Sequence, residues 1–355
     1  MAVKVQVRVT QMCAERLRGG HMWVYRNEIA HMDPGCQDGG LVRVSDPKGH
    51  FLATGYLNTR SSIPVRILSF AEKELDHDFI AERIEKALSQ RLNWGYSRVG
   101  SFRVVHSEGD FLPGLIIDKY EDSAVFQLLT LWMERQRDTV ISTITEVLNP
   151  RILVERSDVS VREKEGLPLR KAILTGNNPR KIISLDGLNF EIDLLEGQKT
   201  GFYLDVQRIR QDLGPYVKER NVLDCFSYSG AFSVYAIQAG ARHVLAVEET
   251  TLGADFLNKN IELNGCRGKI EALKADAFEI LREHTRNKRK YGCVILDPPS
   301  FAKSVREKAG ALKGYREIAL RGIMLLEEGG CLIMTSCSQH ISQEDLKKAL
   351  RIAQK

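Results

Sequence analysis

The sequence lacks the features that define several large classes of protein. No uninterrupted apolar run approaches the roughly 18 residues of a membrane-spanning helix, and the first residues alternate valine with Lys4 and Arg8, unlike a signal peptide. The seven cysteines include no Cys-x-x-Cys pair, so we expect neither a disulfide framework nor a metal site. These absences predict a soluble, cytoplasmic protein without a membrane or metal partner.

Over most of the chain, positively and negatively charged residues are nearly equal in number. Residues 1–70 contain nine Lys/Arg and five Asp/Glu, whereas the remaining residues contain 42 and 41. The net charge of +5 is therefore concentrated at the N-terminus. This pattern fits either an ordinary basic surface or a module that binds a polyanion, and charge alone does not separate the two.

The 355 residues divide into three regions of different pattern. Residues 1–72 alternate short strands with dense turn signals, which predicts a small β-barrel. Residues 73–180 mix helix and strand in an α+β domain, and residues 181–355 begin with a hairpin turning at Asp186-Gly187. Strand and helix then alternate, which predicts a doubly wound parallel sheet. The fold class is α/β multidomain.

The expected elements follow hydrophobic periodicity. In the first region we expect strands at 3–9, 41–45, 51–56 and 63–68 and a helix at 14–20. In the second we expect strands at 102–106, 114–120, 124–131 and 152–155 and helices at 78–94 and 134–148. In the third we expect strands at 222–225, 243–248, 269–274, 292–296 and 330–335 and helices at 205–218, 229–239, 251–264, 276–287 and 310–328.

Acidic residues stand at the ends of four successive strands of the third region. They are Asp224, Glu248, Asp276 and Asp297. In a parallel sheet these ends meet at one edge, where ligands bind. No G-x-G-x-x-G loop is present to cradle a pyrophosphate, so a nucleoside ligand is indicated. Each acid taken alone is explained equally well as a helix N-cap. For the four acids taken together, ligand binding is a better explanation than capping.

The arrangement resembles the class I S-adenosylmethionine-dependent methyltransferases. Its sharpest element is Asp297-Pro298-Pro299-Ser300-Phe301, where two prolines stiffen the turn and hold the acid toward a planar base. The fifth strand ends in Thr335-Ser336-Cys337-Ser338, which places Cys337 at the same sheet edge. A thiolate there suits attack on C6 of a pyrimidine, which makes C5 nucleophilic.

Three motifs together resemble the bacterial large-subunit ribosomal RNA cytosine-C5 methyltransferases, the ribosomal RNA large subunit methyltransferase I group. They are the Asp-Pro-Pro segment at 297–301, the segment 335–338 that contains Cys337, and Asp224-x-Phe226-x-Tyr228-Ser229-Gly230. Further similar segments cover nearly the whole chain: residues 20–25 resemble the opening of the family's PUA domain, residues 108–115 its central domain, and residues 197–205 the segment before the first motif.

The resemblance implies S-adenosyl-L-methionine as cofactor, S-adenosyl-L-homocysteine as product and large-subunit (23S) ribosomal RNA as partner. It implies Cys337 as nucleophile and Asp297 as the acid that holds the cytosine edge. The implied cofactor-binding residues are Lys199, Thr200, Gly201, Asp224, Phe226, Ser227, Gly230, Glu248, Asp276, Ala277, Asp297 and Pro298. The oligomeric state stays open, with a homodimer among the alternatives.

The chain departs from the family pattern in places. Met22 stands where the family commonly has proline, and Ser300 where a related group has a second cysteine, so the base for the C5 proton is unidentified. The family's domain normally continues with a further β-hairpin after the fifth strand, and we expect none up to Lys355. Lys303 and neighbouring basic residues are candidates for phosphate contacts.

Three other functions stay open at this stage. Uracil-C5 methyltransferases share the Ser-Cys and Asp-Pro-Pro motifs, and methylation of a base nitrogen needs only the latter. A noncatalytic RNA-binding or ribosome-assembly factor would keep the fold without the chemistry. The target nucleotide, and whether free RNA or an assembled particle is the substrate, are not readable from the sequence.

Overall fold

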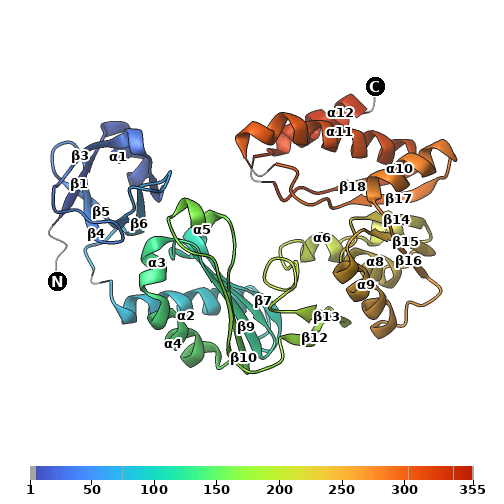
Figure 1. The fold of residues 1–355 in the computed structure, drawn as a ribbon, viewed down its shortest axis with the longest axis horizontal. Coiled ribbons are helices and arrows are strands. Elements are labelled where there is room, and N and C mark those ends of the chain that lie inside the picture. The colour runs from blue at the N-terminus through green and yellow to red at the C-terminus, as the bar shows by residue number, and fades with distance from the viewer. Residues whose placement is uncertain (1–4, 74, 303, 339, 354–355) are drawn as a thin grey trace. The chain divides into compact units, whose positions relative to one another are not determined.

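A computed structural model describes residues 5–73, 75–302, 304–338 and 340–353 of the chain (Figure 1). The chain forms two compact units, which are described separately. The N-terminal unit contains residues 1–181 and 193–204, and the C-terminal unit contains residues 182–192 and 205–355. No described helix is both long and apolar enough to span a bilayer.

The first part of the N-terminal unit is a six-stranded sheet in the order β2-β6-β5-β4-β1-β3. In β1, Val7 and Val9 are buried while Arg8 between them is exposed, as the alternation predicts. β1 pairs in parallel with β4 and antiparallel with β3. The elements are β1 (Gln6–Val9), α1 (Gln11–Arg18), β2 (Trp23–Val24), β3 (Ile29–Met32), β4 (Leu41–Ser45), β5 (Phe51–Leu57) and β6 (Val65–Ser69).

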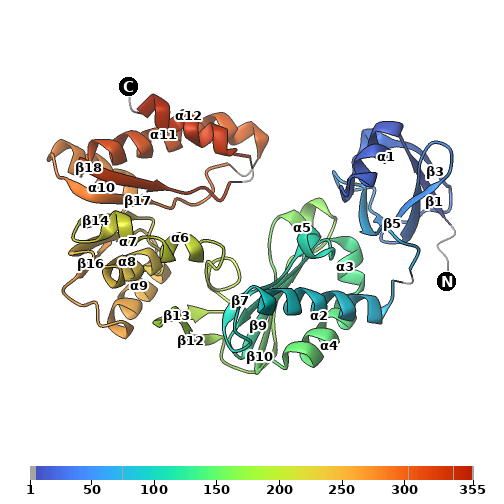
Figure 2. The ribbon, with the colours of Figure 1, turned by 180° about the vertical axis from the view of Figure 1, so that it is seen from behind.

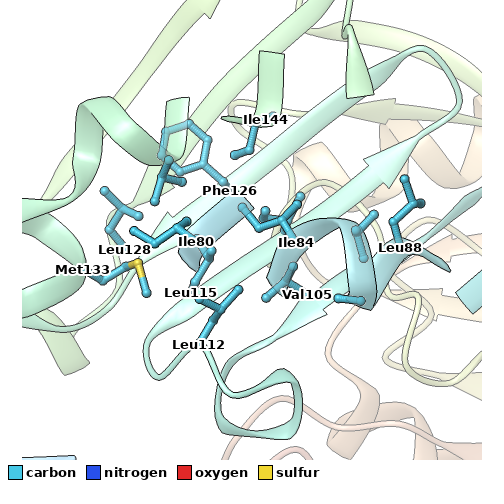
Figure 3. Packing of buried hydrophobic residues seen from close by; sticks show 14 of the residues in the cluster. Ile80, Ile84, Leu88, Val105, Leu112, Leu115, Phe126, Leu128, Met133 and Ile144 are labelled. Carbon is cyan, nitrogen blue, oxygen red and sulfur yellow. The ribbon is translucent and has the colours of Figure 1, made fainter. Parts of the chain in front are cut away.

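The second part of this unit is a five-stranded sheet in the order β11-β10-β9-β8-β7. The long helix α2 (His77–Asn93) lies along it, as Figure 2 shows from behind. Ile80, Ile84 and Leu88 recur every four residues and pack into the same buried cluster as Leu115 and Phe126 of the sheet (Figure 3). The other elements are β7 (Ser101–His106), β8 (Leu115–Tyr120), β9 (Ser123–Leu128), α3 (Leu131–Arg135), α4 (Arg137–Leu148), β10 (Ile152–Ser157), α5 (Val161–Lys164) and β11 (Arg170–Thr175).

Charged side chains join the two sheets of the N-terminal unit. The indole Nε1 of Trp23 donates to Glu108 at 2.8 Å, and Arg66 donates to the same carboxylate at 2.9 Å. Arg66 also donates to the buried Glu165 at 3.3 Å. Part of the positive charge counted in residues 1–70 is thus neutralised by acids from later in the chain.

The C-terminal unit is built on a parallel sheet in the order β16-β15-β14-β17-β18. Leu223, Val247 and Leu296 of its strands share one buried cluster with residues of α10, α11 and α12. The elements are β14 (Asn221–Cys225), α8 (Ala231–Gln238), β15 (His243–Glu248), α9 (Thr251–Leu263), β16 (Ile270–Lys274), α10 (Ala277–Arg286), β17 (Tyr291–Leu296), α11 (Lys308–Met324), β18 (Leu326–Met334) and α12 (Gln343–Ala353). The doubly wound sheet is confirmed.

The hairpin β12 (Arg180–Leu185) and β13 (Leu188–Asp193) turns at Asp186-Gly187, as predicted. Both turn residues have positive φ, 54° and 79°, which an Asp-Gly pair adopts readily. The helix predicted at 205–218 is instead two short helices, α6 (Gln207–Gln211) and α7 (Gly214–Val217), because Pro215 begins a new helix at its first turn.

Some predicted boundaries are wrong. The strand expected at 124–131 ends at Leu128 and a helix starts at Leu131, and the helix expected at 310–328 ends at Met324. β18 starts at Leu326, earlier than predicted. The prediction missed this start because Glu327, Glu328 and Gly329 are exposed and do not give a strand pattern. The sequence prediction also missed β3 and β11, because neither strand has a fully buried residue and neither alternates apolar with polar side chains.

Candidate functional site

The turn after β14 is held in an uncommon backbone conformation. Phe226 and Tyr228 have φ of 62° and 45°, in the left-handed region that side chains disfavour. Gly230 follows with φ of 73° and caps α8, which begins at Ala231 rather than Ser229. A Cβ on Gly230 would lie 2.3 Å from Leu257, so this glycine lets α8 approach α9. Strained turns of this kind concentrate at ligand sites.

Asp224 precedes this turn and is fully buried. Its Oδ2 accepts a 2.6 Å hydrogen bond from Ser233, whereas Oδ1 has no partner among the described residues. Burial raises the pKa of Asp224 to about 7, with a further contribution from the negative charge of Asp297. A buried carboxyl oxygen without a partner is costly, and a polar ligand group would satisfy it.

Glu248, at the end of β15, is also buried and holds two neighbouring segments. Its Oε2 accepts the Tyr228 N–H at 2.8 Å, and its Oε1 accepts the Thr250 N–H at 2.9 Å. Ser227 donates to the Val247 carbonyl at 3.2 Å, so the turn after β14 is tied to β15 at two points. The carboxylate therefore organises the turn as well as standing at a strand end, where the sequence places it.

Asp276 is the N-cap of α10, the structural role that any strand-end acid can have. Its Oδ1 accepts the N–H groups of Phe278 and Glu279 at 2.6 and 3.3 Å. Beside it, the ring of Phe278 lies 5.9 Å from Phe226 and 5.8 Å from Phe301, centroid to centroid, and Ala277 is buried. The carboxyl ends of β14, β16 and β17 thus bring three aromatic rings together, a surface suited to a planar base.

The two predicted catalytic residues lie on loops that are bonded to each other. Thr335 donates a hydrogen bond to the Asp297 carboxylate, and its N–H donates to the Leu296 carbonyl at 3.0 Å. The Sγ of Cys337 lies 3.8 Å from the Pro298 carbonyl oxygen, within the sulfur hydrogen-bond range. The structure therefore brings Cys337 and the Asp-Pro-Pro turn together, as the motifs predict.

The exposure of Cys337 distinguishes it from the other cysteines. It is exposed, whereas Cys13, Cys225, Cys266 and Cys293 are buried and Cys36 and Cys331 are partly buried. Burial raises the pKa of all six of these other thiols, which disfavours the reactive thiolate.

Lys199, Thr200 and Gly201 belong to the N-terminal unit. Thr200 is buried, where it donates to Asp118 at 2.6 Å and bonds the Tyr120 hydroxyl at 2.8 Å. Lys199 lies over the ring of Tyr203 and has a φ of 54°. The structure gives these residues a packing role within their own unit.

Sequence analysis missed Arg210 of α6. This guanidinium is 2% exposed and lies over the rings of Phe232 and Tyr235. Burial lowers its pKa, while the negative charges of Asp205, Asp297 and Asp186 oppose that shift. The positive charge of this buried arginine interacts favourably with the negative charge of Asp297. The short, broken helix carried no periodic signal that could have identified it.

The basic residues expected to contact phosphates have mixed environments. Lys308 pairs with Asp345 at 2.7 Å, and Lys290 donates to the carbonyls of Met324 and Leu326. Arg306 and Arg316 are exposed. Lys303 lies outside the described residues. Within the described part of the chain, no group of three or more His, Cys, Asp or Glu side chains could hold a metal ion.

The fold resembles that of solved methyltransferase structures. A Streptococcus mutans chain assigned as a SAM-dependent methyltransferase aligns with a TM-score of 0.84, 22% identity and coverage of 98% of this chain and 90% of that chain. A second solved chain, crystallised in complex with SAH, gives a TM-score of 0.85 at the same identity and coverage. The parallel sheet with polar strand ends therefore has the Rossmann-like fold of these solved methyltransferases.

Sequence comparisons identify the family. Residues 7–70 match the PUA-like domain model, and residues 207–349 match the model described as conserved hypothetical protein 95. Ribosomal RNA large subunit methyltransferase I of Aliivibrio fischeri (strain MJ11) is 37% identical over 327 residues, which cover 91% of this chain and 83% of that protein. The protein of the same name from Vibrio cholerae (strain O395) is 37% identical over 341 residues, covering 94% and 86%. The chain belongs to the ribosomal RNA large subunit methyltransferase I family.

Proposed function

We propose that this protein methylates C5 of a cytosine in large-subunit (23S) ribosomal RNA, with Cys337 as the nucleophile. The observation that carries the proposal is the position of Cys337. It is an exposed thiol at a strand end, bonded to the loop that bears Asp297. A methyltransferase acting on a base nitrogen needs the acid but has no use for a thiol at that position.

S-adenosyl-L-methionine is the proposed cofactor. The residues present fit a nucleoside: Asp224 has an unpartnered buried oxygen, and Phe226, Phe278 and Phe301 form an aromatic surface. Asp224, Phe226, Ser227, Gly230, Glu248, Asp276, Ala277, Asp297 and Pro298 would hold it, and we keep Lys199, Thr200 and Gly201 as proposed contacts. When bound, it supplies an electrophilic methyl group, leaving S-adenosyl-L-homocysteine as product.

The chemistry proposed for the chain's own residues is addition and elimination on the cytosine. The Cys337 thiolate forms an S–C6 bond, and the electron pair of the C5–C6 double bond becomes available at C5. Asp297, in its protonated form, donates a hydrogen bond to N3 of the ring while negative charge develops there. Once C5 carries the methyl group, loss of the C5 proton to a base restores the double bond and expels the thiolate. No residue is assigned as that base.

Ribosomal RNA as the substrate is supported by the names of the relatives and by the PUA-like match over residues 7–70. A base inside a duplex cannot reach a protein thiol, so the target cytosine must be unpaired or extruded from its stack. We retain the division into an RNA-binding barrel (1–72), a central domain (73–180) and a methyltransferase domain (181–355) as part of the proposal.

Product analysis tests this function. The protein is incubated with S-adenosylmethionine and ribosomal RNA from cells that lack it, and the digested nucleosides are identified by mass spectrometry. We expect 5-methylcytidine. Formation of 5-methyluridine, or of a nitrogen-methylated base, would assign one of the alternative methylation reactions instead. Calorimetry with S-adenosylmethionine separates the enzymes from a noncatalytic factor, which would bind no cofactor.

A further inference from the structure

Tyr315 of α11 is buried directly behind the loop that carries Cys337. The side chain is fully buried, and its ring lies 4.8 Å from Phe301 of the Asp-Pro-Pro segment. Its hydroxyl oxygen is 2.8 Å from the Ser336 Oγ and 3.3 Å from the Ser338 Oγ. One buried hydroxyl thus bonds both residues that flank the proposed nucleophile.

The hydrogen bonds around Tyr315 can be given a direction, because each hydroxyl carries one hydrogen. Ser300 donates its hydrogen to the Ala302 carbonyl at 3.0 Å, so it must accept from Ser338, 2.9 Å away. The hydrogen of Ser338 is then committed, so Tyr315 donates to Ser338. By the same reasoning Ser336 donates to Tyr315. The chain of donors runs from Ser336 through Tyr315, Ser338 and Ser300 to the Ala302 carbonyl.

This chain connects the two loops that the reaction requires. Ser336 and Ser338 lie on the loop after β18, and Ser300 and Ala302 lie on the segment after β17. Sheet pairing between the two strands ends at Met334 and Leu296, before either proposed catalytic residue. Beyond that point, the backbone hydrogen bond from the Thr335 N–H to the Leu296 carbonyl continues the alignment, and side-chain hydrogen bonds extend it to Ser338.

We infer that Tyr315 is a positioning residue: its hydroxyl anchors the residues on both sides of Cys337 to α11, while its ring packs on Phe301 of the segment that bears Asp297. The inference rests on the proposed function, since it assumes that Cys337 reacts. A nucleophile displaced by about 1 Å from its attack geometry can lose about 100-fold in rate. In this chain of hydrogen bonds Ser300 donates to the Ala302 carbonyl and accepts from Ser338, so Ser300 also helps to align the two loops.

Replacement of one hydroxyl tests the inference. Tyr315→Phe keeps the ring against Phe301 and removes only the hydroxyl that bonds Ser336 and Ser338, while the hydrogen bond from the Ser338 N–H to the Ser336 Oγ at 3.2 Å remains. We expect kcat to fall about 10- to 100-fold, with KM for RNA and the affinity for S-adenosylhomocysteine within about twofold of wild type, because positioning affects the reacting geometry and not ground-state binding. The rate of adduct formation with RNA containing 5-fluorocytidine should fall by the same factor as kcat.

Tyr291→Phe is the matched control. Tyr291 is a second buried tyrosine of the same unit, and its hydroxyl is 2.9 Å from the His284 Nδ1. Its removal should lower the melting temperature as much as Tyr315→Phe does, yet leave the adduct rate unchanged. Equal adduct rates for wild type and both variants would overturn the inference.

A double-mutant cycle tests whether the rate loss of Tyr315→Phe acts through Ser338. If Tyr315 acts through Ser338, the rate effects of Tyr315→Phe and Ser338→Ala should be strongly non-additive; additive effects would contradict a connected chain. Cys337→Ala separates this inference from the proposed function. Full turnover by Cys337→Ala would refute the proposed function, whereas inactive Cys337→Ala with fully active Tyr315→Phe would refute the positioning role alone.

Discussion

The inner strands and the edge strand of the C-terminal sheet present their functional residues in opposite environments. Asp224 and Glu248, at the ends of β14 and β15, are buried between neighbouring strands and helices. Cys337 follows β18, an edge strand of this sheet whose residues are partly exposed or exposed throughout, and is itself exposed. The sheet alone fixes the inner acids, but it cannot fix the cysteine.

This difference corresponds to two chemical tasks. In the proposed function, a small cofactor enters the buried strand ends, where one Asp224 oxygen without a described partner and three aromatic rings are available. The target base must be extruded from its RNA before it meets the nucleophile, so the thiol has to be accessible from outside. Cys337 is exposed, and the hydrogen bonds of Tyr315 with Ser336 and Ser338 hold its loop.

The largest expected effect is the loss of the edge thiol. Cys337→Ala should lower turnover by about 1,000-fold or more, because it removes the thiol proposed to form the bond to C6. Cofactor affinity should stay at the wild-type level. The measurement is methyl transfer from labelled S-adenosylmethionine to ribosomal RNA.

Cys331→Ala is the control for this variant. Cys331 lies on the same strand, is partly buried and has its pKa raised by burial, so we expect activity close to wild type. If Cys331→Ala were inactive and Cys337→Ala active, the assignment of the nucleophile would be wrong.

Replacement of Asp297 is expected to lower turnover less than the loss of Cys337 does. Asp297→Asn should lower kcat by about 100-fold, because the amide lacks the acidic proton that stabilises negative charge at N3, while the Thr335 hydrogen bond can persist. Asp255→Asn, at an exposed acid of α9, controls for the change of net charge. Wild-type kcat in Asp297→Asn would remove the acid from the reaction.

The smallest effect on turnover, but a distinct pH signature, is expected for the inner acid Asp224. Its pKa is about 7 in the folded protein against 3.8 for the ordinary group. The folded state therefore retains a proton that the unfolded chain loses, so this group lowers stability as the pH rises from about 4 to 7 and contributes no further change above 7.

Asp224→Asn should remove that dependence. In thermal unfolding without cofactor, the melting temperature of the variant relative to wild type should rise between pH 4 and pH 7 by about 5 °C. Parallel pH profiles for the two proteins would show that Asp224 titrates normally. Asp255→Asn again serves as the control and should track wild type across the whole range.

The sequence predicted the inner strands better than the edge. In β14, β15 and β17 apolar residues directly precede Asp224, Glu248 and Asp297, so the strands and the acids at their ends were readable. The start of β18 was missed because its first residues face solvent, and the Tyr315 chain was invisible because it joins residues from three segments far apart in sequence. Arg210 was not predicted because the charges that surround it come from distant parts of the sequence and meet only in the folded unit.

The most direct test of the central claim is to trap the bond between Cys337 and the base. Fluorine at C5 cannot leave as the proton does, so RNA carrying 5-fluorocytidine should stall after methyl transfer with the protein attached. The account predicts a covalent complex that requires S-adenosylmethionine and maps by peptide mass spectrometry to the peptide containing Cys337. Absence of that complex under conditions in which ordinary ribosomal RNA acquires 5-methylcytidine, or attachment at another cysteine, would contradict it.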